Sequence, residues 1–106
     1  MAKYLAQFSY TEEGLKGLIK EGGTMRRQAT EQLVKAMGGK LEAYYFAFGD
    51  YDGLAIFDGP TNIDAAAVSL MVNASGAVKV KTTVLLTPEE VDSAVKMSVP
   101  YRPPGK

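Results

Sequence analysis

The chain has 106 residues, a length that suits a single domain, and its 12 Lys and Arg residues balance its 12 Asp and Glu residues. The zero net charge provides no overall field to attract nucleic acid or an anionic membrane, so we expect neither as a partner. The absence of Cys and His excludes disulfides, imidazole catalysts and zinc sites that use these residues, and we expect no metal and no cofactor.

The first part of the chain predicts a strand followed by a long helical stretch. Residues 3–10 alternate in the manner of a strand. Thr11 is the expected N-cap of the helix that follows, because two glutamates then lie in a first turn where the helix dipole favours negative charge. An apolar stripe with a helical period runs through residues 15–37, but Gly22 and Gly23 interrupt it. We expect either a kink in one helix or two separate helices.

The middle of the chain predicts a hairpin and a further helix. Residues 40–48 read as a strand with aromatic side chains on both faces. A short turn leads to a partner strand over residues 51–58, and we expect Gly49 to adopt the positive φ that such turns often need. A helix is expected from about residue 63 to residue 74, capped by the Thr or Asn just before it.

The last part of the chain predicts a strand, a short helix and an extended tail. The strand covers residues 77–86. Thr87 and Glu90 have the spacing of a capping box, with Pro at the first helical position, so a helix is expected to about residue 98. We therefore expect one domain over residues 1–98, followed by a Pro-rich tail over residues 99–106 that cannot be helical.

This order of elements predicts an α+β, ferredoxin-like βαββαβ domain with a four-stranded antiparallel sheet and an extra C-terminal helix. Both main helices should cover one face of the sheet. Residues 43–48 and 54–57 nevertheless carry apolar side chains on both faces, whereas a face in contact with water should be polar. We therefore expect a homodimer, or a higher homo-oligomer, that pairs sheet to sheet. No signal sequence or membrane span is apparent, and we expect a cytoplasmic location.

Several short motifs along the chain also belong together. They are Tyr4, the helix start from Thr11 to Gly14, the run Gly38, Gly39, Lys40, Leu41, the turn with Gly49, Tyr51 and Asp52, and the closing Leu86, Thr87, Glu89 and Glu90. In this order and spacing, over roughly residues 3–97, they resemble the GYD domain family, a group within the dimeric α/β barrels. The resemblance implies two ferredoxin-like protomers that pack sheet to sheet with their helices outside. It implies no established activity.

The turn of Asp50, Tyr51 and Asp52 is a candidate catalytic group. Two carboxylates and a phenol could perform general acid–base chemistry if a pocket raised the pKa of one carboxylate. The structural alternative is that these residues make the turn, pack, and hydrogen-bond to nearby backbone amides.

Two further groups are candidates for binding. Candidate ligand-binding residues for a small apolar or aromatic molecule are Tyr4, Gln7, Tyr44, Tyr45, Phe46 and Phe48. These residues could equally form the core and an interface. Arg26 and Arg27 are candidate anion-binding residues: if a helix begins at Thr24, they oppose its dipole, and a bound anion would relieve that conflict. If the helix is continuous, they are ordinary surface arginines.

Three functions remain open at this point. The chain could be a homodimeric small-molecule-binding protein with a site between the two sheets. It could instead be a weak acid–base enzyme, similar to an isomerase or a cofactor-free oxygenase, that uses Tyr44 or Tyr45 with Asp50 or Asp52. The third function is a purely structural oligomeric module, in which the same residues form core and interface. We favour the ligand-binding homodimer.

Overall fold

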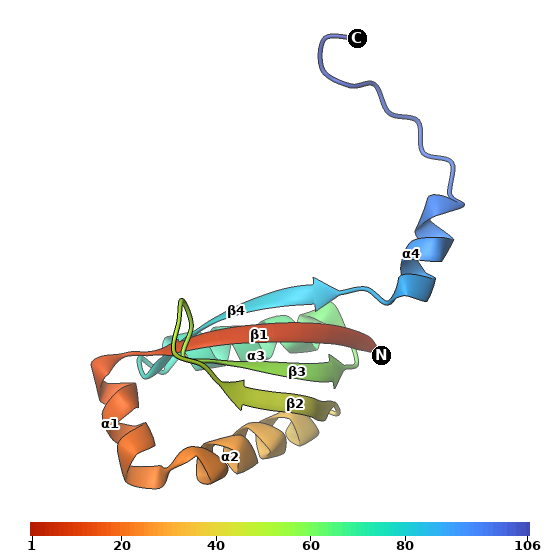
Figure 1. Ribbon diagram of the computed structural model, residues 1–106. Coiled ribbons are helices and arrows are strands. Elements are labelled where there is room, and N and C mark those ends of the chain that lie inside the picture. Colours follow the sequence, from red (N-terminus) through yellow and green to blue (C-terminus); the bar gives the residue numbers. More distant parts are fainter.

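The computed structural model describes residues 1–106 and contains eight regular elements (Figure 1). In chain order they are β1 (Ala2–Tyr10), α1 (Glu12–Glu21), α2 (Gly23–Ala36), β2 (Lys40–Phe46), β3 (Gly53–Gly59), α3 (Asn62–Ala74), β4 (Val78–Leu85) and α4 (Pro88–Val95). The four strands form one antiparallel sheet in the order β2-β3-β1-β4, with β1 and β3 in the middle. This is the α+β, ferredoxin-like arrangement that the sequence predicts.

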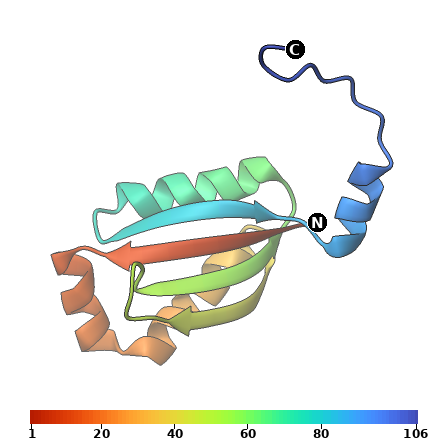
Figure 2. The same cartoon turned by 45° about the horizontal axis from the view of Figure 1, so that its top comes forward.

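The helices α2 and α3 cover the same face of the sheet (Figures 1 and 2). The helix α2 packs on β2 at one edge, and α3 packs on β4 at the other edge. None of the helices combines the length and the hydrophobicity that a membrane crossing requires. The arrangement leaves the central strands β1 and β3 beneath the space between the two helices, which is where the candidate site lies.

The first helical stretch is two helices, because the chain turns sharply at Gly22. This residue has a φ of 85°, a left-handed value that glycine adopts at little cost. The next residue, Gly23, lies against the ring of Phe46, and a Cβ atom there would be 2.9 Å from Phe46 Cε2. The break therefore allows α2 to start close to β2 and to run back across the sheet.

Short polar side chains fix the helix starts as expected. The hydroxyl of Thr11 accepts a hydrogen bond from the Gly14 amide (3.2 Å) at the start of α1. Thr87 and Glu90 form the predicted capping box of α4, with each side chain accepting from the backbone amide of the other residue. For α3, the cap is Thr61, whose hydroxyl accepts from the backbone amide three residues later.

The core is built around Tyr4, which is only 1 % exposed. Its ring stacks on Phe57 with centroids 5.3 Å apart, and its hydroxyl donates a 2.6 Å hydrogen bond to Asn62 Oδ1. Val34 of α2 and Ala65 of α3 complete this buried cluster. The core therefore joins both helices to the central strands at the end of the sheet where β1 begins.

The hairpin between β2 and β3 differs from the sequence prediction. Residues 47–52 form a loop instead of a tight turn, and the Ala47 amide closes it by donating to the Asp52 carbonyl (2.8 Å). The expected positive φ at Gly49 was wrong, because this residue is not among the glycines with positive φ. A loop of this length reverses the chain without a left-handed residue at that position.

The second face of the sheet has no helix over it, and we call it the open face. Side chains along a strand point to alternate faces of the sheet. In each strand, every second residue faces the helices, and the residues in between face the open face. Leu5 is the register partner of Ile56, and Gln7 is the partner of Leu54. Tyr45 of β2 is the register partner of Leu54 of β3 and is 66 % exposed. The open face is thus apolar in its middle.

Residues 86–106, which include α4, extend away from the sheet in both views, and we call them the C-terminal arm (Figures 1 and 2). The helix α4 ends at Val95, three residues before the expected end. The arm exposes large apolar side chains: Leu86, Val91, Val95, Met97, Val99 and Tyr101. Because of this arm, the radius of gyration is 16.8 Å, compared with about 13 Å for a compact domain of about 100 residues.

Candidate functional site

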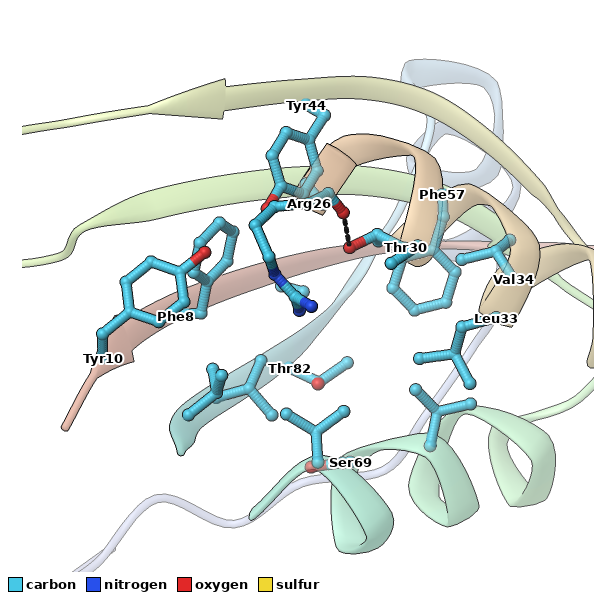
Figure 3. A pocket seen from close by; sticks show the side chains of 17 residues that line it. Phe8, Tyr10, Arg26, Thr30, Leu33, Val34, Tyr44, Phe57, Ser69 and Thr82 are labelled. Atoms are coloured by element: carbon cyan, nitrogen blue, oxygen red, sulfur yellow. Dashed lines mark hydrogen bonds between the residues drawn. The ribbon is translucent and has the colours of Figure 1, made fainter. Parts of the chain in front are cut away.

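A cavity of about 310 Å³ lies between the two helices and the covered face of the sheet (Figure 3). Its volume is about twice the roughly 150 Å³ that encloses benzene in an engineered core, and it falls at the lower end of the about 300–1,000 Å³ of ligand pockets. The walls come from α2, α3 and all four strands. The lining side chains are mostly apolar: Ala6, Phe8, Ala29, Leu33, Val34, Ala55, Phe57, Val68, Val72, Val78 and Val80, together with Tyr10 and Tyr44.

The cavity exists because small residues meet in the middle of the sheet. Ala6 of β1 and Ala55 of β3 are direct register partners, and both line the cavity. The helices pack mainly on the edge strands β2 and β4, and the alanine pair lies on the central strands beneath the space between them. Side chains of a central strand pair normally fill such a space, and two methyl groups do not.

Aromatic rings form one end of the cavity. The ring of Phe8 lies 5.5 Å from that of Tyr44 and 5.6 Å from that of Tyr10, measured between centroids. Phe46 packs edge-on against Tyr44 at 5.4 Å. Edge-to-face and tilted contacts of this kind are favourable, so the rings support one another in this wall.

Arg26 is the one cationic side chain that lines the cavity, and its guanidinium group points into the middle of it (Figure 3). Its Nε atom is buried and has no hydrogen-bond partner. One terminal nitrogen lies 3.8 Å from a carboxylate oxygen of Glu21, which is too long for a hydrogen bond. The Arg26 side chain is 31 % exposed, and it also borders a second hollow beside α1, together with Leu18 and Glu21.

Hydroxyl groups provide the remaining polar lining. Burial raises the pKa of Tyr44 above its usual value, and the neighbouring Tyr10 hydroxyl acts in the same direction, while Thr30 and Arg26 oppose it. The shift favours the neutral phenol that a tyrosine already is at neutral pH, so Tyr44 can donate a hydrogen bond. The hydroxyls of Thr30, Ser69 and Thr82 also lie at the cavity wall (Figure 3).

The structure distributes the six candidate ligand-binding residues over different places. Tyr44 lines the cavity, and Phe46 packs directly behind it. Tyr4 belongs to the core and does not line the cavity. The cavity lies on the helix side of the sheet, whereas the sequence analysis expected a site between two sheets.

The other three candidates lie away from the cavity. Gln7 and Tyr45 point to the open face, on the opposite side of the sheet. Phe48 is fully exposed in the loop between β2 and β3, at 104 % of its reference area. The two arginines separate as well: Arg26 enters the cavity, and Arg27 is exposed on α2 outside it.

The candidate catalytic turn also lies outside the cavity. Asp52 Oδ2 accepts a 2.8 Å hydrogen bond from the Tyr10 amide, and the Asp52 amide donates to the Phe8 carbonyl (2.9 Å). These bonds tie the loop to the end of β1. Asp52 therefore has the structural role given as the alternative above, in which its carboxylate accepts a hydrogen bond from a backbone amide. Asp50 is exposed, and Tyr51 does not line the cavity. No three acidic side chains lie close enough together to hold a metal ion.

Most of the cavity lining escaped the sequence analysis. Ala29 and Leu33 belong to the apolar stripe that the helical period predicts, but a period does not show that such residues line a space instead of a packed core. The pairing of Ala6 with Ala55 depends on strand register, which joins residues far apart in the chain. Two signals pointed here: the arginine pair after the Gly22 break, and Tyr44 among the aromatic candidates.

Comparison with known proteins gives one match. The family model described as the GYD domain matches residues 4–95, a segment that contains every residue of the cavity lining. No curated protein sequence and no solved structure matches the chain.

Proposed function

The chain belongs to the GYD domain family, and we propose that it is a homodimeric protein that binds a small, mainly apolar or aromatic molecule. The observation that carries this proposal is the cavity of about 310 Å³ above the Ala6 and Ala55 pair. Protein interiors are close-packed, and voids much larger than a water molecule are few. An apolar space of this volume with one charged side chain in its wall is typical of a binding pocket.

The direct test is binding of toluene, followed through the backbone amide signals of the protein by NMR. We expect shifts at residues that line the cavity, such as Ala55 and Val80, and none on the open face. Ala6→Leu extends a side chain into the cavity and should weaken toluene binding by about tenfold or more. Ala66→Leu, on the exposed side of α3, is the matched control and should bind as the wild type does. Absence of shifts at the lining residues at saturating toluene would refute the proposal and favour the structural module.

Homodimerisation is the second part of the proposal, and the open face supports it. Leu5, Leu54 and Ile56 form an apolar row across the two central strands, with no helix of the same chain over it. Contiguous apolar area on a sheet face is typical of an interface. A second copy of the chain is the occupant we propose, because sheet-to-sheet pairing is what the family resemblance implies and because the face carries both signs of charge.

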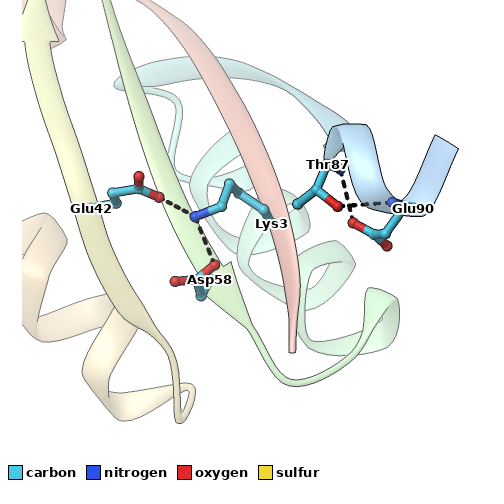
Figure 4. A network of polar contacts seen from close by, with 5 residues as sticks. All are labelled: Lys3, Glu42, Asp58, Thr87 and Glu90. Carbon is cyan, nitrogen blue, oxygen red and sulfur yellow. Dashed lines mark hydrogen bonds and ion pairs between the residues drawn. The ribbon is translucent and has the colours of Figure 1, made fainter. Parts of the chain in front are cut away.

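The charges of the open face lie at separate places. Lys3 forms ion pairs with Glu42 and Asp58, across the strands from β1 to β2 (Figure 4). Lys79 and Lys81 on β4 are exposed and form no ion pair within the chain. In a two-fold symmetric dimer, the acidic groups of one copy can face the free lysines of the other copy, and the same contact then occurs twice.

The geometry of the cavity gives little support to the alternative of an acid–base enzyme. The titratable side chains at the cavity wall are Tyr10, Arg26 and Tyr44, and no Asp or Glu is among the lining residues.

A cytoplasmic location also remains a part of the proposal, and fractionation of cells with detection of the protein in each fraction tests it.

A further inference from the structure

We propose that the ligand of this cavity is a small monocarboxylate: an aromatic ring or a short branched chain lies in the apolar part, and its carboxylate binds the guanidinium group of Arg26. This inference rests on the proposed function, since it names the class of molecule that the cavity takes.

The first step is the state of Arg26. A guanidinium group is charged at every accessible pH and carries five N–H donors in a fixed plane. Its Nε donor is buried without an acceptor, which is a cost that folded proteins rarely leave uncompensated. This donor is too buried for a cavity ligand to reach, so it leaves the terminal nitrogens as the groups that bind. A carboxylate in the cavity can accept from the two terminal nitrogens together, a paired geometry that Arg and carboxylates form well.

The second step is the charge balance inside the cavity. No acidic side chain is among the lining residues, so nothing at the wall itself neutralises Arg26. The nearest acid given by the structure is Glu21, which lies at the end of α1 and is 43 % exposed. Its contact of 3.8 Å with Arg26 is a weak, solvent-exposed pair and leaves the donors on the cavity side free. The cavity thus has a net positive charge that favours an anionic ligand.

The third step is the division of the cavity into a polar and an apolar part. Arg26 lies together with the Tyr44 phenol and the Thr30 hydroxyl near α2 (Figure 3). The Tyr44 phenol provides a second donor for a carboxylate oxygen. Across the cavity, α3 contributes the apolar side chains of Val68 and Val72, and its Ser69 hydroxyl already accepts a hydrogen bond from Asn73 (3.4 Å). A molecule with one charged end and one apolar end matches this division.

The fourth step is size. The cavity holds about twice the volume of a cavity that encloses one benzene ring. One ring with a short carboxylate chain fits such a volume, whereas a long fatty acid does not. A dianion is also disfavoured, because only one cationic side chain lines the cavity.

The test compares phenylacetate with phenylacetamide, a neutral molecule of nearly the same shape. Binding is measured by NMR titration of the same lining amides, at low ionic strength. We expect the wild type to bind phenylacetate about tenfold or more tightly than phenylacetamide. Arg26→Gln should remove this difference. Arg27→Gln removes a charge from the next position on the same helix, outside the cavity, and should keep the difference.

The outcomes separate this inference from the proposed function. If both probes bind at the lining amides with equal affinity, the carboxylate inference is overturned and the cavity remains a binding site for neutral molecules. If the preference for phenylacetate persists in Arg26→Gln or disappears in Arg27→Gln, Arg26 is not the anion-binding group. If neither probe nor toluene binds, the proposed function fails. The wild-type comparison alone decides the charge preference, so the test does not depend on the folding of a variant.

Discussion

The hydroxyl of Tyr4 donates a 2.6 Å hydrogen bond to the side-chain oxygen of Asn62. This bond joins the most deeply buried aromatic residue of β1 to the first turn of α3. It ties the start of α3 to the central strand β1, and both of these elements contribute walls of the cavity.

Tyr4→Phe should lower the free energy of unfolding by about 1 kcal/mol, since it removes one hydrogen bond and leaves the ring stacked on Phe57. Tyr45→Phe removes an exposed hydroxyl and is the control, with an expected change of less than about 0.5 kcal/mol. Chemical denaturation measures both. Equal stabilities of the two variants would show that the bond to Asn62 contributes nothing.

Gly53→Ala should be strongly destabilising, because a Cβ atom there would overlap the ring of the buried Phe8 and approach the Tyr45 carbonyl oxygen to 2.9 Å. We expect a loss of about 1–3 kcal/mol, the usual cost of overpacking. Gly49→Ala is the control, because no atom lies within 4 Å of a Cβ at that position and its φ is not positive. Thermal unfolding of the two variants compares them, and a Gly49 variant as unstable as the Gly53 variant would contradict the loop geometry.

Asp52→Asn should cost on the order of 1 kcal/mol or less, because the amide oxygen still accepts a hydrogen bond from the Tyr10 amide. Asp52→Ala should cost more, since that amide then loses its acceptor. Binding of toluene should be the same in wild type and Asp52→Asn, as the residue does not line the cavity. A folded Asn variant that no longer binds would return Asp52 to the candidate site residues.

Stability should fall at alkaline pH, in part through Tyr44. Its pKa is raised by burial, so the folded chain keeps this proton at a pH where the unfolded chain, with a pKa near 10, releases it. The contribution is fully present below about pH 10 and decreases as the pH rises further. Lys3, whose pKa is raised by its hydrogen bonds to Glu42 and Asp58, acts in the same direction.

The variant Tyr44→Phe isolates the part due to Tyr44. Denaturation at about pH 8 and about pH 11 should show a smaller alkaline loss of stability in this variant than in the wild type. An equal loss would mean that Tyr44 ionises as an exposed tyrosine does.

Leu54→Glu should shift the protein from dimer to monomer, because it places a charge in the middle of the apolar row on the open face. Ile63→Glu adds the same charge in the first turn of α3, where Ile63 is 81 % exposed, and should remain dimeric. Light scattering at micromolar concentration measures the mass. A wild-type mass near the 11.4 kDa of one chain would refute the proposed homodimer.

The sequence predicts the fold well because its signals for the elements are local. Thr11, Thr87 and Glu90 specify helix starts through bonds to residues only three positions away. The break at Gly22 was predictable as one of two alternatives, since a glycine pair permits both a kink and a turn.

The candidate site was predictable only in part, because it depends on contacts between distant segments. Arg26 was recognised from its position after Gly22, but the sequence does not distinguish it from Arg27, its neighbour on the same helix. Only the rotation of α2 against the sheet places one in the cavity and the other in solvent. Tyr4 and Tyr44 looked equivalent as aromatic strand residues, and packing makes one a core residue and the other a cavity wall.

The C-terminal arm determines where a label or a solid support can be attached. The arm leaves β4 beside the start of β1, where Leu85 is paired with Lys3. The cavity lies toward the other end of these strands, between Ala6 and Tyr10 of β1. A fluorophore or a sensor surface linked at Lys106 therefore starts far from α2, the helix that carries Arg26 (Figure 1). Immobilisation through the C-terminus should leave ligand uptake by the captured protein unchanged.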